Sequence, residues 1–101
     1  MTSKIALITG ATAGIGRATA IRLAQSGFDI IICGRRADKL KEVKDEISGI
    51  GVKVLTKILD VRNRADVEAF INLLPAEWKN IDVLVNNAGL AAGLNSLPKV
   101  I

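Results

Sequence analysis

Residues 4–16 read KIALITGATAGIG, and this stretch decides the fold. The apolar run from Lys4 to Thr9 predicts a buried strand. Gly10 predicts a sharp turn at the end of that strand, and Gly14 and Gly16 open a segment in which apolar residues return at helical spacing. A strand that turns through glycines directly into a helix is the first part of a βαβ unit. The sequence therefore predicts an α/β fold.

Strands and helices alternate along the rest of the chain. Apolar runs at residues 28–33, 52–59 and 81–85 predict three further strands. A helix is expected before each of them, which predicts a doubly wound parallel sheet, the Rossmann fold, with strand order 3-2-1-4. Residues 90–101 show no clear period and are expected to form a loop.

The three helices are expected to be amphipathic. The first is expected to end in a left-handed cap at Gly27, and the third to begin at an Asn63 cap and to stop or bend at Pro75. Their expected buried faces are Ile15, Ala18, Ile21 and Ala24 in the first helix, Leu40, Val43, Ile47 and Ile50 in the second, and Val67, Phe70, Ile71 and Leu74 in the third.

Composition narrows the class of protein. At 101 residues, half of them hydrophobic, the chain forms one small domain or part of a larger one. The net charge of +4 is mild and scattered, which argues against a nucleic-acid surface. No apolar stretch approaches the ~18 residues of a membrane span, and no signal peptide precedes the first strand, so we expect a cytoplasmic protein that binds no membrane.

Cys33 and Trp78 are expected to have structural roles. Cys33, the single cysteine, sits inside an apolar run and is interpreted as a buried strand residue in preference to a reactive thiol. Trp78 is interpreted as a packing residue. The sequence holds no His, and we assign no metal ligand.

The glycines predict a phosphate site. Gly14 lets the backbone approach a phosphate without an intervening Cβ, and Gly16 lets the new helix pack closely on the sheet. The helix N-terminus adds free N–H groups and the positive end of its dipole. We therefore expect the pyrophosphate of a dinucleotide to bind here. The alternative is a glycine-rich turn without a ligand.

The end of the second strand indicates which dinucleotide binds. An NAD site usually has an acidic residue there, but this chain has Arg35 and Arg36. Two cations before a helix N-terminus are disfavoured by the helix dipole, and guanidinium groups match the geometry of a 2′-phosphate. We predict NADP(H) over NAD(H). The alternative is two solvated surface arginines.

The third and fourth strands also end in polar residues. Asp60 can accept a hydrogen bond from the adenine amino group, and Val61 can pack against the ring. Asn86 and Asn87, followed by Ala88 and Gly89, can line the ribose and leave room for the cofactor. The alternatives are an ordinary loop aspartate and a polar turn.

Together these motifs resemble the short-chain dehydrogenases/reductases, and among them the bacterial NADP-dependent serine/3-hydroxy acid dehydrogenases. The resemblance rests on TGATAGIG at 9–16, on LDVRNRA at 59–65 and on NNAGLA at 86–91. It implies an oxidoreductase that transfers hydride between NADP(H) and a small 3-hydroxy acid or serine-like substrate. It implies a homo-oligomer, a tetramer for the whole protein. It also implies cofactor contacts at Gly10, Ala11, Thr12, Ala13, Gly14, Ile15, Gly16, Arg35, Arg36, Asp60, Val61, Asn87 and Gly89.

The chain departs from the family at the catalytic residues. The family uses a Ser, a Tyr-x-x-x-Lys pair and a further Asn, whereas this sequence contains no Tyr. Ser96 and Lys99 precede the family's catalytic helix and are no substitutes. We therefore assign no catalytic residue and interpret residues 1–101 as a dinucleotide-binding Rossmann domain, truncated before the catalytic segment and inactive alone. The alternative is a non-catalytic dinucleotide-binding or scaffold module.

Overall fold

The computed structural model describes residues 4–10, 14–60 and 62–86. The elements alternate as the sequence predicts. The first, third and fourth strands are one to three residues shorter than their apolar runs, and the second begins and ends one residue later than predicted. In chain order they are β1 (Ile5–Thr9), α1 (Gly14–Gln25), β2 (Asp29–Gly34), α2 (Ala37–Ser48), β3 (Val54–Ile58), α3 (Arg64–Asn72), the 3₁₀ turn η1 (Ala76–Trp78) and β4 (Val83–Asn86).

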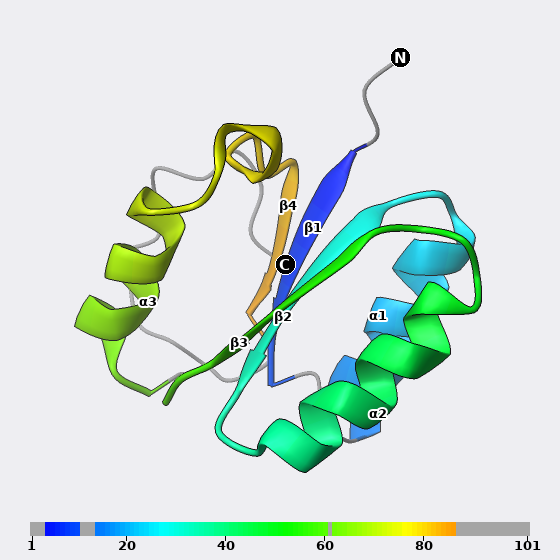
Figure 1. Cartoon of the computed structure of the whole chain (residues 1–101), viewed down its shortest axis with the longest axis horizontal. Helices are drawn as coiled ribbons and strands as arrows, with labels where there is room; N and C mark the ends of the chain where they lie inside the picture. The colour runs from blue at the N-terminus through cyan, green and yellow to red at the C-terminus, as the bar shows by residue number, and fades with distance from the viewer. Residues whose placement is uncertain (1–3, 11–13, 61, 87–101) are drawn as a thin grey trace.

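The four strands form one parallel sheet in the order β3-β2-β1-β4, which confirms the predicted order. Helices α1 and α2 cover one face of the sheet, and α3 covers the other (Figure 1). The chain thus winds outward from β1 through β2 to β3. It then crosses through α3, on the other face of the sheet, to place β4 beside β1 on the side away from β2.

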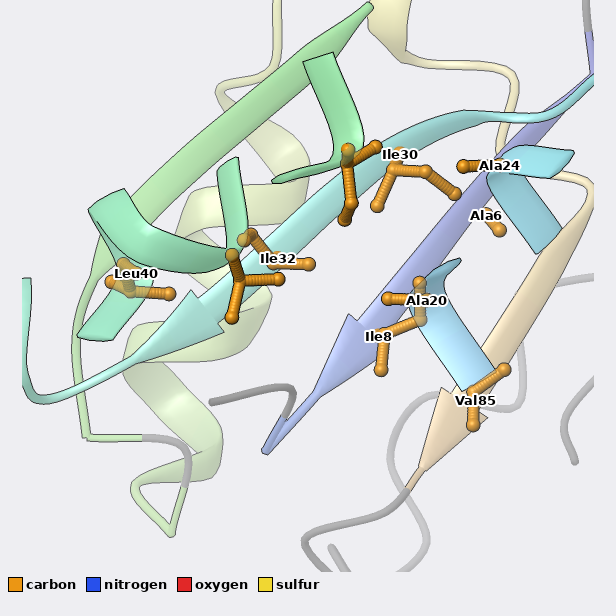
Figure 2. Close-up of a cluster of buried hydrophobic side chains, with 10 residues drawn as sticks. Ala6, Ile8, Ala20, Ala24, Ile30, Ile32, Leu40 and Val85 are labelled. Carbon is orange, nitrogen blue, oxygen red and sulfur yellow. The ribbon is translucent and has the colours of Figure 1, made fainter. Parts of the chain in front are cut away.

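Alternate residues of β1 and β2 supply two separate cores. Ala6, Ile8, Ile30 and Ile32 pack with Ala20 and Ala24 of α1 and with the buried face of α2 (Figure 2). On the opposite face, the core beneath α3 and η1 is formed by Ile5, Leu7, Ile31, Cys33, Val67, Leu74, Trp78, Ile81 and Leu84. Because both faces of β1 and β2 are covered, their sequences are almost wholly apolar.

The buried face of α1 differs from the sequence prediction. Ile15 is 78% exposed and Ala18 is exposed, whereas Gly16, Ala20 and Ala24 are buried. These three small residues recur every fourth position and so share one side of the helix. The helix packs on the sheet through this small-residue side, because short side chains let its backbone come close. The prediction was right for Ala24 and for the partly buried Ile21, which packs against the core, and wrong for Ile15 and Ala18.

The other two helices follow the prediction more closely. In α2, Leu40, Val43 and Ile47 are buried, but the helix ends at Ser48 and leaves Ile50 38% exposed. In α3, the Asn63 cap is confirmed, since its Oδ1 accepts a hydrogen bond from the Asp66 N–H at 3.2 Å.

The expected packing roles and the first helix's ending agree with the structure. Gly27 follows α1 with a positive φ of 94°, as the predicted left-handed cap requires. Cys33 is fully buried in β2, and Trp78 is 8% exposed in the core beneath α3.

Candidate nucleotide-binding site

The carboxyl ends of all four strands meet along one edge of the sheet. Thr9, the last residue of β1, is in register with Cys33 of β2 and with Asn86 of β4, and Gly34 is in register with Ile58 of β3. Gly10, Arg35 and Asp60 follow these strands and are therefore brought to the same edge. In doubly wound sheets this edge binds ligands at the point where the winding reverses, which here lies between β1 and β4.

The turn from β1 into α1 has room for a phosphate. Gly10 and Gly14 have φ angles of 68° and 61°. A Cβ on Gly14, the first residue of α1, would meet no atom within 4 Å. The first turn of α1 carries no acidic side chain, so nothing there opposes an anion at the helix N-terminus. This open space fits the expected pyrophosphate. Ile15 is exposed there, and Ala11, Thr12 and Ala13 lie outside the described residues.

The two arginines after β2 differ in their surroundings. Both are exposed. Arg36 precedes α2 directly, and its Nη2 lies 3.8 Å from Oδ2 of Asp38 in the first turn of that helix. Among the described residues, no carboxylate lies within ion-pair distance of Arg35. The charge of Arg35 is therefore available to a ligand.

Asp60 makes a two-pronged contact that the sequence analysis did not foresee. Its Oδ1 accepts hydrogen bonds from Arg62 Nε at 3.1 Å and from the Arg62 backbone N–H at 2.9 Å, and its Oδ2 accepts one from Arg62 Nη2 at 3.1 Å. These hydrogen bonds lower the pKa of Asp60, as does the charge of Arg35 to a smaller degree. The spacing Asp-x-Arg after a strand was the available signal. Val61, between the two, lies outside the described residues.

A side-chain hydrogen bond joins β1 to β4 where the winding reverses. Thr9 is fully buried, and its Oγ1 donates to the Val85 carbonyl at 3.4 Å. The bond links the residue before the glycine turn to the last part of β4. Asn86 follows in register with Thr9, and Asn87 and Gly89 lie outside the described residues.

Comparison with known proteins settles the family. The family model described as "short chain dehydrogenase" matches residues 4–99. This chain belongs to the short-chain dehydrogenases.

Named relatives within the family are similar over most of the chain. An NADP-dependent 3-hydroxy acid dehydrogenase from Salmonella typhi is 53% identical over 95 residues, which is 94% of this chain and 37% of that protein. A serine dehydrogenase in its closed form, complexed with NADP⁺, is 51% identical with a TM-score of 0.72, over 82% of this chain and 32% of that one. Serine dehydrogenase from Escherichia coli is 53% identical with a TM-score of 0.74, over 88% and 40%.

The chain thus spans less than half the length of these short-chain dehydrogenases. The comparisons confirm the family and the fold that the motifs predicted. The individual cofactor contacts stay predictions.

Other features of the described residues lie outside this site. In ranges 4–10, 14–60 and 62–86, no helix is long and apolar enough to cross a membrane, and no cluster of His, Cys, Asp or Glu could hold a metal ion. A largely apolar groove of about 550 Å³ runs between β3 and α3, away from the glycine turn.

Proposed function

We propose that residues 1–101 form the dinucleotide-binding domain of an NADP(H)-dependent short-chain dehydrogenase. The whole protein would transfer hydride between the cofactor and the hydroxyl-bearing carbon of a small 3-hydroxy acid or serine-like substrate. The cofactor supplies the hydride donor or acceptor. The names of the relatives support this choice of cofactor and substrate class.

Each part of the cofactor has a proposed partner at the carboxyl edge of the sheet. The backbone of Gly10–Gly16 would hold the pyrophosphate at the N-terminus of α1. Arg35 and Arg36 would hold the 2′-phosphate, with Arg35 the stronger contact because Arg36 shares its charge with Asp38. The remaining contacts would be Asp60 and Val61 with the adenine, and Asn87 and Gly89 with the ribose nearest the nicotinamide.

One observation supports the proposal most directly. In the described part of the chain, no atom beyond the immediate neighbours and the backbone of α1 itself lies within 4 Å of where a Gly14 Cβ would be, and this position is at a helix N-terminus beside the reversal of winding. The backbone there adopts a conformation that side chains disfavour, although no neighbouring protein atom requires the absence of a side chain. Gly27 shares this backbone conformation and these open surroundings, so the position of Gly14 at a helix N-terminus is what supports a bound phosphate.

The test compares two glycines with the same backbone property. Gly14 and Gly27 have positive φ, and neither would bring a Cβ within 4 Å of another atom. Both Gly14→Ala and Gly27→Ala should therefore lower the free energy of unfolding, by about 1 kcal/mol. Gly27 lies beyond the opposite end of α1, about 18 Å along the helix.

Only Gly14→Ala should weaken NADPH binding, by about tenfold or more, measured by isothermal titration calorimetry. Equal NADPH affinity in Gly14→Ala and Gly27→Ala would rule out a phosphate at the glycine turn.

The substrate class needs a separate measurement on the natural protein that carries this chain. Its intact mass decides whether residues 1–101 are the whole of it. NADP⁺ reduction in the presence of serine and other small 3-hydroxy acids should then be seen if a catalytic segment follows. Tight NADPH binding with no turnover of any hydroxy acid would favour a binding module instead. Assembly as a homo-oligomer is part of the same proposal and is tested by light scattering.

A further inference from the structure

Asp60 poses an electrostatic problem for the proposed cofactor site. It follows β3, and Arg35 follows the neighbouring strand β2, with the Leu59 N–H donating to the Gly34 carbonyl at 2.9 Å between them. A carboxylate at this position repels a 2′-phosphate. It also attracts the guanidinium of Arg35, which the phosphate needs as its own partner.

Arg62 balances most of the negative charge of Asp60. Its guanidinium contacts both oxygens of the Asp60 carboxylate, and its backbone N–H adds a third hydrogen bond. A guanidinium and a carboxylate in this two-pronged geometry form a compact neutral pair. The carboxylate stays ionised and fixed in orientation, yet its charge is balanced locally.

The charged side chains that follow β2 and β3 then have a net positive charge, which suits a phosphate. Arg36 pairs with Asp38, and Asp60 pairs with Arg62. Of this group, Arg35 has no carboxylate within 4 Å among the described residues. One guanidinium is thereby kept for the ligand, in a local field that is positive overall.

We propose that Arg62 is a specificity-determining residue for NADP(H) that acts by neutralising Asp60 and not by touching the cofactor. This rests on the proposed function. Arg62 is thus a positioning residue, and its loss should affect the cofactor that carries the 2′-phosphate far more than the one that lacks it. One uncompensated charge about a Debye length from a phosphate changes its affinity by roughly two- to fivefold.

The experiment is a double-mutant cycle read out as the ratio of the Kd for NADH to that for NADPH, by titration calorimetry at low salt. Arg62→Gln should lower this ratio about two- to fivefold. Arg62→Lys keeps the charge and should retain most of the ratio. The double variant Asp60→Asn/Arg62→Gln removes both charges of the pair, so its ratio should return to that of the unmutated protein. The effect of Arg62→Gln should also shrink in 0.5 M salt.

Three results would overturn the inference. A ratio that stays low in the double variant Asp60→Asn/Arg62→Gln would mean that Arg62 contacts the phosphate itself. Equal weakening of NADH and NADPH by Arg62→Gln would mean that it only orients Asp60. No change in either Kd would mean that Arg62 takes no part in cofactor binding. Failure of the proposed function looks different, because the unmutated protein would then bind neither dinucleotide.

Discussion

Ile5 and Asp82, 77 residues apart in sequence, exchange two hydrogen bonds. The Ile5 N–H donates to Oδ2 of Asp82 at 2.8 Å, and the Asp82 N–H donates to the Ile5 carbonyl at 2.9 Å. The pair joins the beginning of β1 to the residue before β4. It therefore sets the register of β1 and β4 at their amino ends. The carboxyl ends of the same two strands border the proposed nucleotide site.

Removing the Asp82 carboxylate should destabilise the sheet. Asp82→Ala leaves the N–H of buried Ile5 without its acceptor, at a cost of about 1–2 kcal/mol in the free energy of unfolding. Asp82→Asn keeps an oxygen acceptor and should cost less than half as much. Urea denaturation followed by circular dichroism measures both. Equal losses in the two variants would show that the hydrogen bond has no special weight.

The small-residue side of α1 makes a prediction with a control in the same helix. Ala20 is fully buried against the sheet, and Ala18 is exposed. Ala20→Leu should overfill the contact and destabilise the fold by about 1–3 kcal/mol. Ala18→Leu adds the same side chain in water and should change stability by less than about 0.5 kcal/mol. Thermal unfolding of the two variants compares them directly, and similar melting temperatures would contradict the observed orientation of α1.

Cys33 should make the fold sensitive to alkaline pH. Burial raises the pKa of its thiol to about 12, from an ordinary value of 9.0. Because the folded-state pKa is the higher one, the stabilising difference is fully present below pH 9 and is lost as the pH rises towards 12. Between pH 8 and pH 10 the free energy of unfolding should fall by about 1.4 kcal/mol from this group.

The control for that prediction is Cys33→Ala, in which the corresponding part of the pH dependence should disappear. The chain contains no Tyr, so no phenol ionises in the same range. A slope between pH 8 and pH 10 that is the same in both proteins would assign the effect to other groups.

The strand order followed from the sequence because local signals and topology rules agreed. Residues 5–8 and 30–33 are apolar without interruption, as strands covered on both faces must be, and the crossovers allow few alternatives. The face of α1 followed only in part, because hydrophobic periodicity weights Ile15 above Gly16. Whether a helix packs through large or small residues depends on how closely it approaches the sheet, which is a tertiary property.

The positions of the candidate residues at the strand ends followed from the sequence, whereas the ion pair beside them did not. Glycines and arginines could be placed because their motifs lie at strand ends, and the structure brings Gly14, Arg35 and Asp60 to one edge. The Asp60–Arg62 pair was not predicted, because a spacing of two residues places side chains together only in particular turn conformations. Sequence alone does not report that conformation.

The sheet order also has a consequence for the sequence of folding events. Strands β1, β2 and β3 with α1 and α2 come from consecutive residues and share one core, so they can assemble while the loops that join them are still short. Strand β4 must close a loop of more than 70 residues to reach β1. We expect pulsed hydrogen exchange to protect the amides of Ile30 and Ile32 before those of β4. The reversal of winding, and any ligand that depends on it, would then be the last feature acquired by the folding chain.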